Sequence, residues 1–155
     1  MQRLWRLYRA AHGPGLDGIG GTIASGRWHT MGTRAVYFGA TAAIVVLERL
    51  AHIDPKLLPR DLRLGLFEFK KAVPVEKIRE LPDRWVENEV GTQRLGTEWL
   101  RARTGCLLEV PSAVLPEESN YLFNPRHAAA EQLQLVQERP FSFDPRLLLK
   151  YSGTG

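Results

Sequence analysis

Short segments with the patterns of β-strands outnumber helical segments along this chain, and the two kinds do not alternate regularly. Regular alternation is typical of parallel α/β proteins. The pattern therefore predicts an α+β fold, with a mixed or antiparallel sheet and flanking helices. The 155 residues suit one domain that spans 1–155, and the chain shows no internal repeat or low-complexity tract.

The expected elements follow from alternation, from β-branched and aromatic content, and from helix caps. Strands are expected at 3–12, 34–40, 62–70, 106–114 and 139–148, with a short strand or turn at 120–125. The segment 127–136 should begin as a helix and become a strand. Helices are expected at 40–53, between a Thr41 N-cap and Asp54-Pro55, and at 88–104, ended by Gly105. The Gly-rich segment 12–26 should be a flexible loop, and 74–85 an irregular segment with a short helical turn.

A carboxylate interrupts the most apolar of these segments. The helix expected at 40–53 is apolar almost all round, so we expect most of it to be buried, and yet it contains Glu48. A buried carboxylate needs a cation or hydrogen-bond donors to offset its lost hydration. An ion pair with Arg49 or another arginine at the helix edge would meet that need. The residues alone favour this explanation, but a functional site would also tolerate the cost.

Four other side chains could contact a ligand. Arg9 and Arg27 could each bind an anion, because a guanidinium group can donate two parallel hydrogen bonds to phosphate oxygens. Trp28 could form the wall of a pocket, and the ring of Tyr37 could stack on a planar heterocycle. Each also has a simpler explanation: a solvated arginine on the surface, or an aromatic side chain in the core.

The remaining polar candidates are less specific. Ser112 lies in no Gly-x-Ser-x-Gly motif and has no obvious triad partners, so a hydrogen bond to a ligand or to a turn is the expected role. Asn124 precedes a proline and is typical of a turn, and His127 could be a catalytic base or a histidine without a role. The single cysteine, Cys106, has no disulfide partner and no metal-ligand spacing around it. We therefore predict a buried Cys106, no metal site and a reducing, cytoplasmic environment.

The charge distribution narrows the class of ligand. The net charge is +4, and the 21 basic residues are dispersed among 17 acidic ones. Proteins that bind nucleic acid usually gather their basic residues on one stripe. The dispersed charge favours a small anionic ligand or an acidic protein partner, and we expect no direct contact with nucleic acid. The N-terminus is too rich in arginine for a signal peptide, and no segment approaches the roughly 20 apolar residues of a membrane span.

Taken in order, a set of segments resembles the RES-domain proteins, which are the toxin halves of bacterial RES–Xre toxin–antitoxin pairs. The segments are "LYRAA" at 7–11, "SGRWHTMGTRAVYFGATAAIVVLE" at 25–48, "LPDRW" at 81–85, "TQRLGTEWL" at 92–100, "LLEVPSAVLPEESNYLFNPRH" at 107–127 and "FSFDPRL" at 141–147. Together they cover essentially the whole chain. Each segment alone is weak evidence for the resemblance, whereas the whole set in this order is specific for the family.

The resemblance assigns catalytic roles to three residues. The family is named for an arginine, a glutamate and a serine, which match Arg27, Glu48 and Ser112. It implies that Glu48 stabilises positive charge on a reacting ribose and that Ser112 orients Glu48 or the nicotinamide amide. Two positions depart from the pattern of many members. Ser25 replaces a glycine and His29 an asparagine, which affects fine substrate contacts and leaves the named catalytic residues intact.

The resemblance also implies binding residues, a substrate and a partner. Arg9 and Arg27 would hold a pyrophosphate, with Trp28 as a pocket wall, Tyr37 stacked on nicotinamide or ribose, and Asn124 as a further contact. The fold would be similar to that of ADP-ribosyltransferases, with NAD+ as substrate and no permanently bound cofactor. The acceptor would be water, phosphate or a protein. An Xre-like antitoxin would block the site in a hetero-oligomer, and a non-catalytic binding or pairing module is the alternative from another class.

Overall fold

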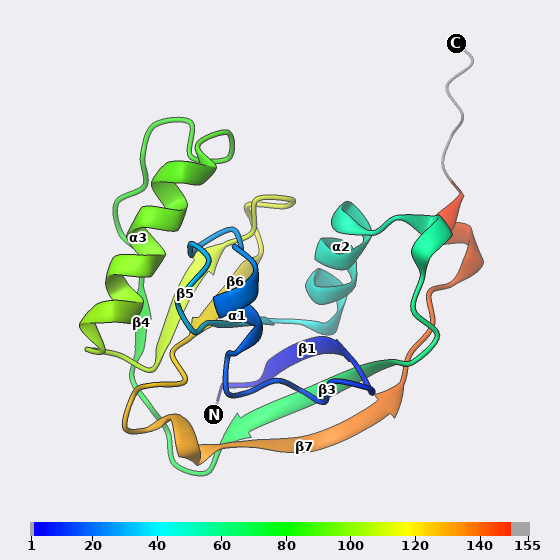
Figure 1. Ribbon diagram of the computed structural model, residues 1–155, viewed down its shortest axis with the longest axis horizontal. Coiled ribbons are helices and arrows are strands. Elements are labelled where there is room, and N and C mark those ends of the chain that lie inside the picture. The colour runs from blue at the N-terminus through cyan, green and yellow to red at the C-terminus, as the bar shows by residue number, and fades with distance from the viewer. Residues whose placement is uncertain (1, 150–155) are drawn as a thin grey trace.

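A single seven-stranded sheet organises the computed structural model, which describes residues 2–149 (Figure 1). The strands are β1 (Leu4–Arg9), β2 (Val36–Gly39), β3 (Leu62–Phe69), β4 (Val75–Lys77), β5 (Leu107–Pro111), β6 (Ser119–Phe123) and β7 (Leu133–Pro140). Their order in the sheet is β4-β5-β6-β2-β1-β3-β7, and among these strands of the described chain only the β4–β5 pair is parallel. The predicted α+β class with a mixed sheet is confirmed.

Two longer helices pack against this sheet, with α3 alongside β4 and β5 and α2 next to β1 (Figure 1). The helices are α1 (Gly20–Ile23), α2 (Ala42–His52) and α3 (Glu89–Ala102), with single 3-10 turns η1 (Pro55–Leu57), η2 (Ala130–Gln132) and η3 (Pro145–Leu148). Thr41 caps α2 as predicted, since its Oγ1 accepts a hydrogen bond from the Ile44 amide at 3.1 Å. Among the helices within residues 2–149, none is long and apolar enough to cross a membrane.

Several expectations about the elements are wrong. The segment 74–85 contains β4, which pairs with β5, and the Gly-rich segment 12–26 contains α1. The strand expected at 139–148 is absent, because β7 ends at Pro140 and η3 begins at Pro145. Arg103, and not Gly105, ends α3 by adopting a left-handed conformation with φ 53°. Only Ile44 of α2 is fully buried, because the helix covers one part of the sheet and borders a cavity.

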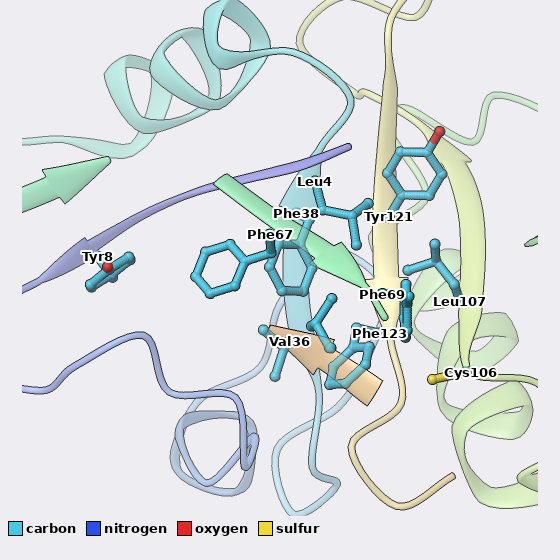
Figure 2. Close-up of a cluster of buried hydrophobic side chains, with 11 residues drawn as sticks. Leu4, Tyr8, Val36, Phe38, Phe67, Phe69, Cys106, Leu107, Tyr121 and Phe123 are labelled. Carbon is cyan, nitrogen blue, oxygen red and sulfur yellow. The ribbon is translucent and has the colours of Figure 1, made fainter. Parts of the chain in front are cut away.

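One face of the sheet encloses the main core. Its aromatic side chains include Phe38 of β2, Phe67 and Phe69 of β3, and Phe123 of β6 (Figure 2). The rings of Phe69 and Phe123 lie 6.2 Å apart, although two strands separate β3 from β6 in the sheet. The sheet therefore curls over this cluster. Cys106 is buried in the same core, as predicted, and burial raises the pKa of its thiol to about 11.

The opposite face carries two separate apolar clusters, one under each long helix. Leu100 of α3 packs with Trp28 and with residues of β5 and β6, whereas Val45 of α2 packs with Leu7 and with residues of β3. Between the clusters, β1 and β2 pair only at Trp5 and Gly39 and then diverge. This gap in the middle of the sheet positions the candidate site.

Candidate active site

A cavity of about 600 Å³ opens where β1 and β2 diverge. Its walls come from both strands, from the second half of α2, and from the segment that begins at Ser25. Elements distant in the sequence therefore meet around one hollow of a size that suits a small ligand. Among the side chains that line it are Arg6, Arg27, Tyr37, Glu48 and Arg49.

The carboxylate of Glu48 is held by two neutral donors. Its Oε1 accepts hydrogen bonds from Ser112 Oγ at 2.5 Å and from Asn120 Nδ2 at 2.8 Å. Both bonds reach the same oxygen, so Oε2 has no protein partner within residues 2–149. No ion pair of Glu48 is found in that range either, so the explanation by an ion pair with Arg49 is wrong. The site holds the acid in place and leaves one of its oxygens available to a ligand.

Ser112 is a positioning residue for Glu48. Its side chain is fully buried directly after β5, and its oxygen accepts hydrogen bonds from the amides of Val114 and Leu115, each at 3.1 Å. These amides occupy the acceptor side of the hydroxyl, so its proton is directed to Glu48. A hydroxyl committed in this way is not a free nucleophile, in agreement with the absence of a nucleophile motif.

Two arginines from the β1 and α2 side carry positive charge into the cavity. Arg6 donates from Nη1 to the carbonyl of Tyr37 at 3.0 Å and from Nε to that of Pro14 at 2.8 Å, which satisfies backbone left unpaired where the strands diverge. Arg49 donates to the carbonyl of Leu7 at 3.1 Å. Burial and the nearby Arg49 lower the pKa of Arg6 to about 10, and burial lowers that of Arg49. Both remain cationic at neutral pH, and an anion between them would relieve their repulsion.

Arg27 approaches the cavity from the opposite wall. Its Nη2 donates to the carbonyls of Trp85 and Val86, the latter at 2.8 Å, and its guanidinium carbon lies 5.6 Å from the centre of the Trp85 ring. Its Nε is buried and has no hydrogen-bond partner among the described residues. Arg27 is therefore braced against the segment at 85–86 and retains an unused donor.

The N-terminal turns of α3 hold the backbone that carries Arg27. Thr92 Oγ1 donates to the carbonyl of Arg27 at 2.8 Å, and Gln93 Nε2 donates to that of Gly26 at 2.9 Å. Farther along the helix, Gly96 lies against the carbonyl of Trp28, where a Cβ atom would clash. The helix is thus the scaffold for this side of the site.

A buried hydrogen-bond network fixes the aromatic wall. His29 Nε2 lies 3.1 Å from two carbonyl oxygens, those of Gly21 and Ala24, and carbonyls only accept. Nε2 therefore carries the proton of a neutral ring, and Nδ1 accepts a hydrogen bond from the Tyr37 hydroxyl at 2.7 Å. That hydroxyl accepts in turn from the Trp28 amide at 3.0 Å. Burial lowers the pKa of His29 and raises that of Tyr37, so this network is uncharged at neutral pH.

The structure brings together most of the residues singled out from the sequence. Arg27, Trp28, Tyr37 and Glu48 line the cavity, and Ser112 reaches it through Glu48. Gly26 also lines it, and a Cβ there would lie only 2.5 Å from the Tyr37 hydroxyl, so a bulkier residue would displace the wall. The roles assigned to these residues stay predictions, but their proximity is a property of the fold.

Two predicted binding residues lie elsewhere. Arg9 is exposed at the end of β1 and pairs with Asp61 at 2.9 Å, outside the cavity. Asn124 is buried at the far end of β6, and His127 accepts a hydrogen bond from the Ala129 amide in the following turn. The position of Arg9 gives no support to pyrophosphate binding, and on β1 the arginine that lines the cavity is Arg6.

Sequence reasoning missed five polar residues that line the cavity: Arg6, Arg49, His52, Glu89 and Asn120. Arg49 was considered only as a partner of Glu48. Asn120 shares a face of β6 with Leu122, but Leu122 and Tyr121 are both buried, so the sequence does not indicate which face borders the cavity. The sequence gives no signal for Arg6 either, because its approach depends on the divergence of β1 from β2.

Comparison with known proteins identifies relatives over nearly the full chain. The RES domain family model matches residues 3–144. "Toxin Res" of Pseudomonas putida KT2440 is 38% identical over 146 residues, which cover 93% of this chain and 98% of that protein. "Prs ADP-ribosylating toxin" of Sphingobium sp. YBL2 is 31% identical over 155 residues, which cover 94% and 96%.

A solved structure shares the fold. The chain matches the crystal structure of the Mycobacterium tuberculosis MbcT–MbcA toxin–antitoxin complex with a TM-score of 0.72, over 91% of this chain and 84% of that one. At 18% identity this likeness concerns the fold alone.

Proposed function

Because the chain belongs to the RES domain family, we propose that it is a toxin that consumes NAD+ by breaking the bond between nicotinamide and ribose. The observation that carries the proposal is the carboxylate of Glu48 in the same cavity as Arg6, Arg27 and Arg49. A second acid, Glu89 at the start of α3, also lines this cavity. NAD+ has a ribose that becomes cationic when this bond breaks and a pyrophosphate that is anionic throughout. A site for it requires both charges within one hollow.

The chemical step follows from the groups around Glu48. The bond between the ribose anomeric carbon and the nicotinamide nitrogen breaks, and its electron pair leaves with nicotinamide, which becomes neutral. Positive charge develops on the ribose, and Oε2 of Glu48 stabilises it while Ser112 and Asn120 hold Oε1. Water or phosphate then adds to the anomeric carbon and releases any surplus proton to solvent. The products are nicotinamide and either ADP-ribose or its phosphate ester.

The remaining cavity residues bind the dinucleotide. Arg6 and Arg49 face each other from β1 and α2 and would bind the pyrophosphate together with Arg27. Tyr37 contributes to the wall against which nicotinamide or ribose would pack, and Trp28, which is only 1% exposed, lies buried next to it. In this assignment Arg6 takes the role that the sequence had suggested for Arg9.

Nicotinamide release by the purified protein tests the proposal. Glu48→Gln keeps the shape of the side chain and removes its charge, so we expect release to fall by about 10²- to 10³-fold while the protein remains folded. Glu98→Gln is the matched control, because Glu98 is an exposed glutamate of α3, and it should keep full activity. Full activity in Glu48→Gln would end the assignment. Assays with and without inorganic phosphate distinguish phosphorolysis from hydrolysis.

Transfer of the ADP-ribosyl group of NAD+ to a protein is the second candidate function. The name of the Sphingobium relative favours it, and the same cleavage of NAD+ would precede it. The discriminating measurement adds NAD+ labelled in its adenylate part to a cell lysate with the protein. Label on a protein would support transfer, and soluble labelled ADP-ribose or its phosphate ester would support hydrolysis or phosphorolysis.

An antitoxin partner belongs to the same proposal. The structural neighbour is part of a toxin–antitoxin complex, and we extend this to an Xre-like antitoxin that covers the cavity of this chain in the cytoplasm. Expression of the chain alone should arrest bacterial growth, and co-expression of the adjacent reading frame should relieve the arrest. A non-catalytic pairing module would form the complex but would neither arrest growth nor release nicotinamide.

A further inference from the structure

A second, smaller cavity of about 170 Å³ lies at the end of the β2–β6 ladder opposite to Asn120. Four arginines border it: Arg34, Arg101, Arg103 and Arg126. They come from three separate places, namely the turn before β2, the C-terminal end of α3 and the turn after β6. We call this hollow the arginine pocket. It shares no lining residue with the cavity of Glu48 and lies about 13 Å from Asn120 along the strand direction.

The positive charge of the arginine pocket is not neutralised. None of the residues that line it is acidic. Across residues 2–149, none of its four arginines forms an ion pair, and Arg34 donates only to the carbonyl of Asp17 at 3.3 Å. Arg101, Arg103 and Arg126 are exposed, so water screens part of the repulsion among the four like charges, and an anion between them would relieve the rest.

Asn124 holds the frame of this pocket. Its side chain is 1% exposed, its Nδ2 donates to the carbonyl of Leu100 at 3.0 Å, and its Oδ1 accepts from the Arg126 amide at 3.1 Å. One buried amide therefore links the end of α3 to the turn that carries Arg126. These hydrogen bonds fix the backbone of Arg126 relative to the end of α3, where Arg101 and Arg103 lie.

Stabilisation of α3 by its own C-terminal cations explains only part of this arrangement. Arg101 and Arg103 lie where positive charge is favourable next to the last helical carbonyls. Arg34 and Arg126 are not on the helix. Arg103 also occupies a left-handed conformation that glycine adopts with less strain. Helix stability alone would therefore favour glycine at 103.

We propose that the arginine pocket binds a phosphate group, either as free phosphate or as the terminal phosphate of a nucleotide. Arginine side chains that border one hollow from three places in the fold can donate paired hydrogen bonds to the oxygens of one tetrahedral anion. A nucleic acid backbone would instead require the charges to follow a stripe, and here they surround a hollow. The proposal does not depend on NAD+ cleavage, because it concerns separate residues.

The test follows amide signals of ¹⁵N-labelled protein by NMR during titration with inorganic phosphate at constant ionic strength. Saturable shifts are expected at Gly32, at Arg126 and at the side-chain amide of Asn124. Arg126→Ala and Arg103→Gly should each weaken binding about tenfold. Arg103→Gly should not lower the stability of the protein, because glycine relieves the left-handed conformation, so loss of binding cannot then be attributed to unfolding.

Controls locate the site and identify the source of the phosphate. Arg79→Ala changes an exposed arginine that lines neither cavity and should leave the affinity within about twofold. The shifts should also persist in Arg49→Ala. Tighter binding of AMP than of phosphate would identify a nucleotide phosphate, and the reverse order free phosphate. Four outcomes would overturn the proposal: shifts that fail to saturate, shifts that persist in both pocket variants, shifts that disappear in Arg49→Ala, and shifts that arise with an oligonucleotide but not with phosphate or AMP.

Discussion

Arg6 and Arg9 lie three residues apart on β1, but only Arg6 reaches the cavity. We predict that Arg6→Ala raises the KM for NAD+ at least about tenfold, because a charged hydrogen bond to the pyrophosphate is lost. Arg9→Ala should leave KM and kcat unchanged, since it removes only an exposed ion pair with Asp61. Steady-state nicotinamide release by both variants measures this.

Arg6 also donates to backbone carbonyls, so its variant needs a control for structural damage. Arg6→Lys keeps the charge and should recover part of the loss in KM. Unfolding of both variants in urea would show how much of the effect is structural. If Arg9→Ala raised KM and Arg6→Ala did not, the assignment of the pyrophosphate site to the cavity would be wrong.

These two arginines also show how far individual residues of the site can be predicted from the sequence. Glu48, Arg27 and Ser112 could be identified because their motifs occur in a specific order along the chain. The same motif order points to Arg9, which lies in "LYRAA", whereas Arg6 is the arginine of β1 that lines the cavity. Which arginine of β1 reaches the cavity depends on where β1 separates from β2. This separation is set by contacts between distant segments, so no local sequence pattern indicates it. Asn120 was missed because nothing within β6 connects it with a carboxylate on α2.

Among the elements, α3 depends most on close packing against the site. A Cβ at Gly96 would clash with the carbonyl of Trp28, next to Arg27. We predict that Gly96→Ala lowers the free energy of unfolding by about 1–3 kcal/mol, although alanine favours the helix by about 1 kcal/mol, because overpacking outweighs propensity. Gly20→Ala, in α1, meets no atom within 4 Å and should not destabilise the protein. Urea unfolding of both variants measures the difference, and equal stabilities would contradict this account of α3.

The elements themselves were predictable where local signals agree with the tertiary structure. The cap of Thr41 and the alternation in β3 correctly indicated a helix and a strand. β4 was missed because it has only three residues and depends on a parallel partner distant in sequence. The segment "FSFD" alternates like a strand, but Phe141 and Phe143 pack against each other and the apolar cluster under α2. An alternating pattern indicates which side chains are buried, but a segment forms a strand only where a neighbouring strand can hydrogen-bond to it.

At the scale of the whole molecule, divergence within the sheet separates two apolar clusters and leaves the cavity between them. Each wall of the site therefore belongs to a different cluster, with α3 supporting Arg27 and α2 carrying Glu48 and Arg49. The buried network of His29 connects α1, the Arg27 segment and β2 on the α3 side of the cavity. The protonation of one histidine should consequently affect the stability of the whole fold.

We predict that the protein loses stability as the pH falls below about 6.5, and that His29 is responsible for a distinct part of this loss. The pKa of His29 is lowered from 6.5 in the folded state by burial, so the unfolded chain binds a proton before the folded protein does. Acid then favours unfolding, with a slope of at most about 1.4 kcal/mol per pH unit for one proton. Urea unfolding at pH 7.5 and 5.5 measures it. The pKa values of Asp61 and Asp144 are lowered from 3.8 and act at lower pH.

His29→Gln removes the titrating group and keeps an amide that can donate and accept, so the loss of stability between pH 7.5 and 5.5 should be smaller than in the unaltered protein. His12→Gln changes an exposed histidine and serves as the matched control. The comparison uses the change with pH and not the absolute stability, because His29→Gln alters the packing of a buried site. An unchanged slope in His29→Gln would mean that His29 is protonated equally in both states. The assignment of a neutral His29 hydrogen-bonded to Tyr37 would then be wrong, and so would the description of this wall of the cavity as uncharged.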